Sequence, residues 1–332
     1  LCDIVQIMKK NIAILRGGNT KEIHISIKSA DVVFQSIDQD KYTPYLIHIE
    51  NQDWNLIDGQ KKWPIQRDDF SCIIDQKKIT FDGVFMAIHG TPGEDGTLQA
   101  YFDLIRIPYN CSGTFESSIT FNKAMCNALL KQFNIRSGKS IILQDKTDFS
   151  PDEIERKIGF PCFVKPNRAG SSLGISKVLR PDLWFEALEK AFEYDQQVIA
   201  ESYIKGIEVS CGIIEKKGEL IVLPLTEIYS ENEFFDYDAK YLGKSQEITP
   251  ARIEKQESDQ IESISKDIYK ILQLKGIVRM DFIIKDKKAY LIEVNTVPGF
   301  TKESILPQQA LTFGLSLKEL FGLSIENMLS HD

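Results

Sequence analysis

Apolar residues in the first part of the chain form short continuous runs separated by one stretch of helical spacing. The runs cover residues 11–15, 45–49 and 83–88, and each has the length of a buried strand. Between the first two runs, apolar positions from Ile25 to Ile37 recur at helical intervals, which predicts a helix. This strand–helix–strand order indicates a parallel sheet, in which ligand sites lie at the carboxyl ends of the strands.

Two glycine-containing pairs fall at such strand ends. Gly17-Gly18 follows the first run, and His89-Gly90 follows the third. Both pairs are therefore candidates for a ligand site. A lone histidine is more often structural than functional, so both interpretations of His89 stay open at this point.

The second part of the chain alternates predicted helices and strands around a glycine- and serine-rich loop. The loop covers 168–174; the helices cover 119–133, 182–192 and 258–274; the strands cover 162–166 and 198–201, with one ending at Val178 and others between 208 and 258. The pattern predicts the α/β class. Because 332 residues exceed one ordinary hydrophobic core, two or three packed domains are expected.

A predicted hairpin around the polar turn at 285–288 carries the strongest chemical signal. Alternate strand residues share a face, so Arg279 lies beside Asp281, and Glu293 lies beside Asn295. The short turn brings Asp281 nearly opposite Glu293. Two carboxylates and an amide oxygen form a hard oxygen site that suits Mg²⁺, and the arginine suits a developing oxyanion. The alternative is a solvated sheet face that binds nothing.

Lys165 ends a predicted strand just before the loop at 168–174. Backbone N–H groups of glycine and serine residues can crowd toward an anion, and a lysine adds a fixed positive charge. A flexible surface loop explains the same pattern, so both interpretations stay open. The chain has no P-loop and no GxGxxG motif, so a dinucleotide-binding fold has no support.

Residues 234–241 combine aromatic, acidic and basic side chains without a clear period. A segment of this kind is long for a simple connection. A mobile lid and an ordinary long loop both fit the pattern.

Composition excludes several classes of function. Hydrophobic residues make up 42% and charged residues 27%, as in soluble globular proteins, and no apolar run approaches the roughly 20 residues that cross a bilayer. A net charge of −8 without a basic block argues against nucleic acid as a partner. The six cysteines occur singly, which indicates buried reduced thiols in a cytosolic protein. Residues 1–7 do not form a secretory signal, and we expect translation to begin at Met8.

Several spaced motifs resemble those of the D-alanine–D-alanine ligases. They are GGNTKE at 17–22, IHGTPGEDG at 88–96, Lys165-Pro166, Gly170-Ser171-Ser172, YDAKY at 237–241 and LIEVNTVPG at 291–299. The resemblance runs from about Asn11 to Leu329. It implies the ATP-grasp fold, α+β overall, with ATP held between two α+β domains.

The resemblance also implies a division into three domains. A Rossmann-like parallel-sheet domain covers 8–113, a central domain covers 114–200, and a catalytic domain covers 201–332 with a lid loop at about 229–250.

The family's reaction has two steps. ATP converts the carboxylate of one D-alanine into an acyl phosphate and leaves as ADP. The amine of a second D-alanine then displaces phosphate and gives D-alanyl-D-alanine for peptidoglycan precursors. The resemblance implies a cytoplasmic homodimer whose partners are D-alanine and ATP, without nucleic acid or membrane. It also implies two Mg²⁺ ions, or Mn²⁺, held by Asp281, Glu293 and Asn295.

Residue roles carry over by matching motif positions. Glu22 binds the ammonium of the first substrate beside His89, Arg279 stabilises the oxyanion, and Ser304 holds the second carboxylate near Gly299. Ser171 and Tyr241 complete the catalytic set across the lid. The residues that match ATP-binding positions are Lys123, Lys165, Ser171, Ser172, Glu201, Glu208, Lys240 and Asn295.

Three positions depart from the family pattern. Ser202 replaces a lysine near the adenine, His24 replaces a second glutamate, and Phe300 replaces a methionine, which we expect to tighten the second substrate's pocket. The intact pair of Lys240 and Tyr241 favours D-alanyl-D-alanine over a depsipeptide. Two alternatives stay open: an ATP-grasp ligase that joins a different acid and amine, and a nucleotide-binding regulatory protein without catalysis.

Overall fold

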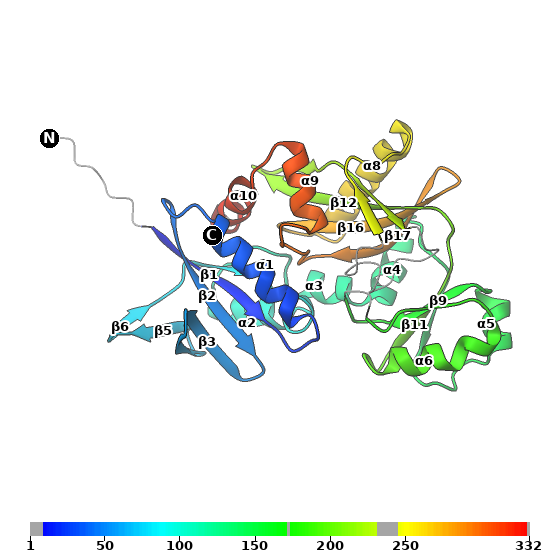
Figure 1. The fold of residues 1–332 in the computed structure, drawn as a ribbon, viewed down its shortest axis with the longest axis horizontal. Coiled ribbons are helices and arrows are strands. Elements are labelled where there is room, and N and C mark those ends of the chain that lie inside the picture. Colours follow the sequence, from blue (N-terminus) through cyan, green and yellow to red (C-terminus); the bar gives the residue numbers. More distant parts are fainter. Residues whose placement is uncertain (1–8, 171–172, 231–244, 331–332) are drawn as a thin grey trace.

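Three sheets, each with its own helices, make up the fold (Figure 1). This computed structural model describes residues 9–170, 173–230 and 245–330. Each sheet borders a separate cluster of buried apolar side chains. In Figure 1 the first sheet lies at one end of an elongated molecule and the second at the other, with the third between and above them.

The first sheet has seven strands in the order β6-β5-β4-β3-β2-β1-β7. Their bounds are β1 Lys10–Gly17, β2 Tyr42–Glu50, β3 Asp53–Asp58, β4 Lys61–Gln66, β5 Ser71–Ile74, β6 Lys77–Ile79 and β7 Gly83–Met86, with helices α1 Ile23–Ser36 and α2 Thr97–Ile105. β1 pairs in parallel with both β2 and β7, which confirms the predicted parallel strands. Strands β3 to β6 add an antiparallel part that was not predicted.

Tight turns build this antiparallel part. Asn51 between β2 and β3, and Asp75 and Gln76 between β5 and β6, have positive φ angles of 52°, 46° and 63°. Asparagine and aspartate tolerate this conformation better than other non-glycine residues, and it suits two-residue hairpin turns. The chain therefore reverses within two residues, and consecutive strands pair antiparallel.

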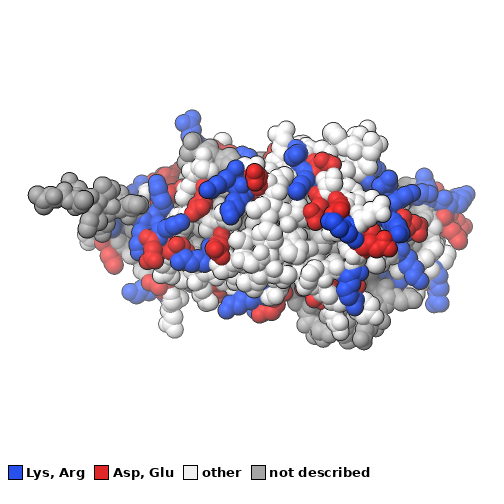
Figure 2. Space-filling view, turned by 90° about the horizontal axis from the view of Figure 1, so that it is seen from above, with Lys and Arg blue, Asp and Glu red and all other residues white. Residues whose placement is uncertain are grey.

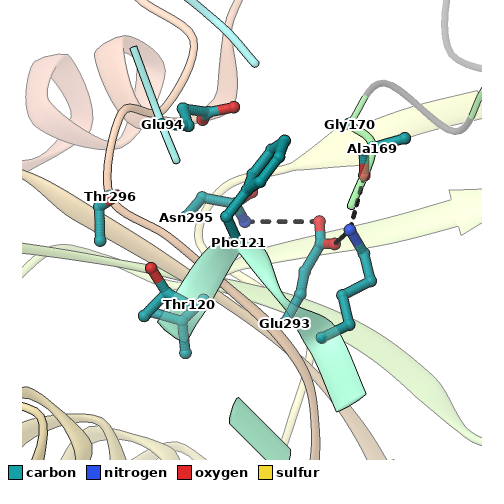
Figure 3. A pocket seen from close by; sticks show the side chains of 10 residues that line it. Glu94, Thr120, Phe121, Ala169, Gly170, Glu293, Asn295 and Thr296 are labelled. Atoms are coloured by element: carbon teal, nitrogen blue, oxygen red, sulfur yellow. Dashed lines mark hydrogen bonds and ion pairs between the residues drawn. The ribbon is translucent and has the colours of Figure 1, made fainter. Parts of the chain in front are cut away.

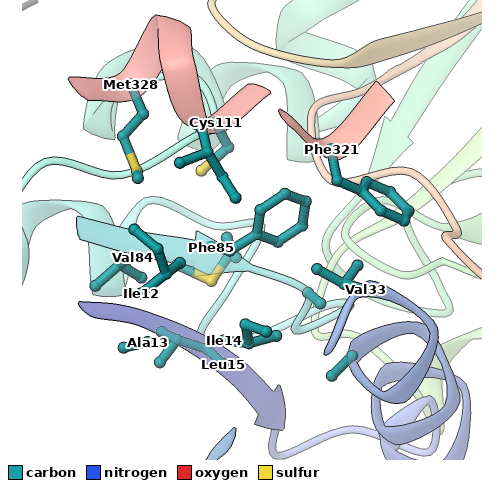
Figure 4. Packing of buried hydrophobic residues seen from close by; sticks show 14 of the residues in the cluster. Ile12, Ala13, Ile14, Leu15, Val33, Val84, Phe85, Cys111, Phe321 and Met328 are labelled. Carbon is teal, nitrogen blue, oxygen red and sulfur yellow. The ribbon is translucent and has the colours of Figure 1, made fainter. Parts of the chain in front are cut away.

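The core of the first sheet includes side chains from the far end of the chain (Figure 4). Ile14 of β1 and Phe85 of β7 are fully buried. Phe321 of α10 (Leu317–Ser330) packs edge-on against Phe85 with ring centroids 5.6 Å apart. The C-terminal helix therefore covers the N-terminal sheet and links the two ends of the chain.

The second sheet is antiparallel, in the order β10-β9-β11-β8. Its elements are β8 Ser140–Leu143, α5 Pro151–Lys157, β9 Cys162–Pro166, β10 Ser176–Val178, a 3₁₀ turn at Pro181–Leu183, α6 Trp184–Phe192 and β11 Val198–Ser202. Trp184 and Leu188, one turn apart on α6, are fully buried against it. The predicted strands at 162–166 and 198–201 are confirmed.

The third sheet has the order β15-β14-β12-β16-β17, with β13 paired to β12. Its strands are β12 Ile207–Lys216, β13 Glu219–Val222, β14 Thr226–Ser230, β15 Ser245–Ile248, β16 Val278–Lys285 and β17 Lys288–Asn295; helices α8 Lys255–Ile271 and α9 Ile305–Phe313 belong to the same part of the chain. The predicted hairpin is confirmed as β16 and β17. Its turn is shorter than predicted, because Asp286 and Lys287 alone form it with φ angles of 50° and 60°.

The predicted helix at 119–133 is two helices, α3 Thr114–Phe121 and α4 Lys123–Lys131. Asn122 separates them, because its side-chain oxygen accepts a hydrogen bond from Met125 N and caps the start of α4. This break places Lys123 at the first position of α4. Cys126 and Leu130 on α4 belong to the core of the third sheet. The domain borders given above stay a prediction.

Charged side chains of both signs are interspersed on the face seen in Figure 2. All five cysteines in the described part of the chain are buried free thiols. Among the described residues, no helix has the length and apolar character needed to cross a membrane.

Candidate active site

The β16–β17 hairpin holds the predicted oxygen site in the predicted register. Asp281 pairs directly with Glu293, and Arg279 pairs with Asn295. A bulge between Asp281 and Phe282 changes the register beyond this point, as bulges often do beside active sites. Asn295 Nδ2 donates to Asp281 Oδ2 at 3.2 Å and to Glu293 Oε1 at 3.4 Å. The hairpin therefore gathers all four polar side chains on one face of the sheet.

Arg279 is the positive centre of this group. Its Nη2 lies 2.8 Å from Asp281 Oδ2 and 3.7 Å from Glu293 Oε1, and its Nε lies 3.1 Å from Asp281 Oδ1. Burial opposes the charge, but Asp281 and Glu293 outweigh it and hold the pKa of the guanidinium above its ordinary value. Among the described residues, this leaves Nη1 for a substrate oxygen.

Lys123 brings the start of α4 to the carboxylate of Glu293. Its Nζ donates to Ala169 O at 2.6 Å and lies 3.5 Å from Glu293 Oε2. Figure 3 shows Glu293 and Asn295 turned toward one another, with Ala169 and Gly170 beside them. A buried lysine held between a loop carbonyl and a carboxylate is placed to neutralise anionic charge that enters this pocket.

Glu22, from the N-terminal part of the chain, lies next to this pocket, against its lining residue Gly170. Glu22 precedes α1 and is 6% exposed, and Thr20 Oγ1 accepts a hydrogen bond from its backbone N–H. Its carboxylate lies against two glycines: a Cβ on Gly170 would come within 2.8 Å of Oε1, and one on Gly90 within 3.2 Å of Oε2. Gly90 also has a φ of +69°, which favours glycine. The two glycines therefore let the backbone of both loops approach the Glu22 carboxylate closely.

Glu94 is a site residue to which no role was predicted. It lies in the quoted motif at 88–96, lines the pocket, and accepts a hydrogen bond from Gly90 N at 2.7 Å. Burial, followed by the negative charge of Glu22, raises the pKa of Glu94 to about 8. Glu94 therefore carries a proton near neutral pH in the ligand-free protein. The only sequence signal for it was its place between Gly93 and Asp95 in that motif.

This protonation predicts a stability difference between the wild type and Glu94→Gln. The folded state keeps the Glu94 proton up to about pH 8, whereas the unfolded chain releases it near its ordinary pKa of about 4.3. Wild-type stability relative to the neutral variant should therefore fall as pH rises from about 5 to about 8. Urea unfolding at several pH values, with EDTA and without nucleotide, measures this. Parallel curves would contradict a proton on Glu94.

Lys165 and Glu201 form a buried ion pair across the paired strands β9 and β11. Glu201 Oε1 also accepts a hydrogen bond from Asn127 Nδ2 at 3.4 Å, which links this sheet to α4. Glu208 on β12 lies on the same face as Ser210, whose hydroxyl donates to Asp281 Oδ1 at 2.7 Å. These predicted ATP-binding positions therefore lie on the second sheet and on β12, the strand that pairs with the hairpin.

Ser304 precedes the first residue of α9, and its hydroxyl lies 2.9 Å from Thr301 Oγ1. The N-terminus of a helix attracts a carboxylate through its backbone N–H groups and its dipole. Gly299 faces the same hydroxyl, because a Cβ there would come within 2.7 Å of Ser304 Oγ.

The ring of Phe300 does not tighten a substrate pocket, contrary to our expectation. It is 1% exposed and packs edge-on against Phe85 and Phe321, with ring centroids 5.6 and 5.7 Å away. The Phe300 ring therefore lies in the hydrophobic core, packed against these two neighbours.

Four predicted site residues lie outside the described part of the chain: Ser171, Ser172, Lys240 and Tyr241. The same holds for most of the predicted lid at 229–250. Their roles stay predictions.

The donor set fits magnesium. Nowhere in residues 9–170, 173–230 and 245–330 do three His, Cys, Asp or Glu side chains gather as a metal site, so Asp281 and Glu293 supply the carboxylates alone. Mg²⁺ is commonly bound by one or two carboxylates together with substrate phosphates. The amide of Asn295 would have to turn its oxygen toward the ion, because its nitrogen now faces the carboxylates.

Known proteins match the chain over nearly its whole length. The family models described as "D-ala D-ala ligase N-terminus" and "D-ala D-ala ligase C-terminus" match residues 11–112 and 129–326. A D-alanine–D-alanine ligase from Flavobacterium johnsoniae is 48% identical over 322 residues, which is 97% of this chain and 100% of that protein.

Solved structures share the fold. The VanG D-Ala:D-Ser ligase from Enterococcus faecalis has a TM-score of 0.86 at 33% identity, covering 97% of this chain and 100% of that one. A D-alanine–D-alanine ligase from Bacillus anthracis complexed with ATP has a TM-score of 0.77 at 28% identity, covering 97% and 98%. The ATP-grasp fold expected from the sequence is confirmed.

Proposed function

The chain belongs to the D-alanine–D-alanine ligase family, and on this premise we propose that it joins two D-alanines at the expense of ATP. The products are D-alanyl-D-alanine, ADP and phosphate, and the dipeptide serves peptidoglycan precursor synthesis. The observation that carries the proposal is the meeting of three parts of the fold at one place. The loop at Ala169 and Gly170 lies against the Glu22 carboxylate and accepts a hydrogen bond from Lys123. Lys123 in turn contacts Glu293, which lies beside Arg279.

In the first step, a carboxylate oxygen of D-alanine attacks the γ-phosphorus of ATP, and ADP leaves. Glu22 holds the substrate's ammonium, since it is a buried carboxylate at the point where two glycine-containing loops meet. Lys123 and Lys165 neutralise the phosphates, together with Lys240, Ser171 and Ser172 as the motifs imply. Glu201 and Glu208 bind the adenine and ribose. Positioning and charge neutralisation provide most of the catalysis in such transfers.

In the second step, the amine of another D-alanine attacks the acyl carbon after losing a proton, and phosphate leaves. The carbonyl oxygen becomes an oxyanion in the tetrahedral intermediate. Arg279 stabilises it through Nη1, while Asp281 fixes the other side of the guanidinium. Ser304 and Gly299 hold the carboxylate of the second substrate at the start of α9. Tyr241 closes the site from the lid, where exclusion of water protects the acyl phosphate.

We assign the metal ligands to Asp281, Glu293 and Asn295, with two Mg²⁺ ions as the proposed complement and Mn²⁺ as a substitute. Bound there, the metal would neutralise charge on the transferring phosphoryl group. We further propose that the enzyme works in the cytoplasm, where its substrates are found, and that it forms a homodimer. The two domain borders given above belong to this proposal.

Phosphate release in the presence of ATP and Mg²⁺ tests the function, with D-alanine, L-alanine and D-serine compared and each product identified by mass. We expect release with D-alanine and a product with the mass of D-alanyl-D-alanine. Because a D-Ala:D-Ser ligase shares the fold, the mixture of D-alanine and D-serine is the decisive comparison. A mixed dipeptide as the main product would overturn the assigned second substrate, and no release with D-alanine would overturn the function.

A further inference from the structure

Three hydrogen bonds join Ser29, His89 and the loop after β17. Ser29 Oγ lies 3.0 Å from His89 Nε2, and His89 Nδ1 lies 3.1 Å from Val297 O. Phe300 N donates to Ser29 Oγ at 3.2 Å. All four residues are at most 5% exposed. The bonds form a closed circuit that leaves the loop at Val297 and returns to it at Phe300.

The circuit assigns the proton on His89. Val297 O can only accept, so Nδ1 carries hydrogen, and Phe300 N can only donate, so it occupies a lone pair of Ser29 Oγ. The hydroxyl hydrogen of Ser29 is then directed to Nε2, which accepts it. A neutral imidazole protonated on Nδ1 therefore satisfies every group in the circuit. A substrate that bonded either ring nitrogen would have to displace Ser29 or Val297.

The two ends of the circuit belong to different halves of the proposed site. Ser29 lies on α1, the helix that starts directly after Glu22, where the first substrate's ammonium binds. The loop from Val297 to Phe300 lies between the proposed metal ligand Asn295 and Ser304, where the second substrate's carboxylate binds. A link between them controls the distance between the two substrates, and small errors in such distances are costly for catalysis.

We propose that Ser29 is a positioning residue for the ligation step: it fixes His89 as the Nδ1–H tautomer and holds the second-substrate loop against the first-substrate helix. The proposal rests on the proposed function, because the two substrate positions come from it. His89 then acts by its position between the two halves of the site, and its ring nitrogens stay bonded to the protein.

The same helix offers a matched control. Ser26 is also fully buried, and its hydroxyl also makes two bonds, accepting from Gly17 N at 3.0 Å and donating to Ala87 O at 2.8 Å. These bonds join α1 to its own sheet and do not reach His89 or the second-substrate loop. Ser26→Ala therefore removes the same atom from the same helix without opening the circuit.

Initial rates against D-alanine concentration, fitted for two D-alanine sites, test the positioning role. In Ser29→Ala we expect the KM of the second D-alanine to rise about tenfold, the effect of one lost buried hydrogen bond, while the KM of ATP stays within about twofold. Ser26→Ala should lose a similar amount of thermal stability without this rise. Ser29→Thr, which keeps the hydroxyl, should restore most of the affinity. If the KM of the second D-alanine changed equally in Ser29→Ala and Ser26→Ala, or changed in neither, Ser29 would have only a structural role.

Imidazole ¹⁵N NMR on the wild type tests the tautomer without any activity measurement. The chain has four histidines, so His89→Gln suffices to assign the His89 signals. We expect a protonated Nδ1 and an unprotonated Nε2, with part of the population moving to the other tautomer in Ser29→Ala. A proton on Nε2 in the wild type would overturn the proposal even if Ser29→Ala does not fold. A wild type with this tautomer but no D-alanine turnover would instead refute the function.

Discussion

Arg279→Ala should lower kcat about 1,000-fold while the affinity for ATP changes only a few-fold. The expected loss equals that of removing one oxyanion donor from other enzymes, because Arg279 is assigned to charge that develops only in the transition state. Asp281 and Glu293 already neutralise the guanidinium in the ligand-free site, so ATP binding gains little from it. Steady-state kinetics and calorimetric titration of ATP measure the two quantities. Equal losses of ATP affinity and turnover would contradict the oxyanion role.

Arg252→Ala is the control for the removal of an arginine that is paired with a carboxylate of the same sheet. Arg252 binds both carboxylate oxygens of Glu227 at 2.8 and 2.9 Å, as Arg279 binds Asp281. Glu227 pairs with Val209, so it points away from the face that carries Ser210 and Asp281. This variant should keep kcat. Arg279→Lys, which keeps the charge but loses the planar fork, should fall between wild type and Arg279→Ala.

The part of the site that is local in sequence was predictable, and the hairpin shows why. Alternation of side chains along a strand places Arg279 with Asp281, and a short turn sets the pairing of Asp281 with Glu293. Both rules act within fewer than 20 residues. The same locality made the strand–helix–strand beginning of the chain predictable, since each element there has a clear hydrophobic period.

The properties that were not predicted depend on contacts between distant segments. The raised pKa of Glu94 depends on its burial and on the charge of Glu22, and the ring of Phe300 lies in the core because it packs against Phe85 and Phe321. None of these neighbours can be identified from the periodicity around Glu94 or Phe300. The break between α3 and α4 has a different cause. Asn122 caps α4 and lies within the segment itself, but the apolar positions keep their helical spacing on both sides of it, so the periodicity predicts one continuous helix.

Negative charge predominates around the pocket in the ligand-free protein. Among the described residues, Glu94, Glu293 and Lys123 line the pocket, and Glu22, Asp281 and Arg279 lie next to lining residues, so the acids outnumber the bases. The ligand-free protein relieves this excess by keeping a proton on Glu94. Bound cations would also reduce the excess of negative charge. Metal binding and the ionisation of the acids would therefore depend on one another.

Glu293→Gln should therefore raise the Mg²⁺ concentration needed for half-maximal activity about 100-fold and lower kcat at saturating metal. Glutamine keeps the size of the side chain but removes one of the two carboxylates offered to the ion, and losses of this order follow even the mutation of outer-shell metal partners. The ligand-free fold should change little, because Arg279 retains its closer partner Asp281. Activity as a function of Mg²⁺, repeated with Mn²⁺, measures the effect.

Glu227→Gln provides the comparison, since Glu227 is a buried, arginine-paired glutamate on the opposite face of the same sheet. It should leave the metal requirement unchanged. Thermal unfolding gives an independent readout: Mg²⁺ with a non-hydrolysable ATP analogue should stabilise the wild type and Glu227→Gln, but stabilise Glu293→Gln far less. If all three proteins gained the same stability and needed the same Mg²⁺ concentration, Glu293 would not be a metal ligand, and its bond to Lys123 would be its main contribution to the site.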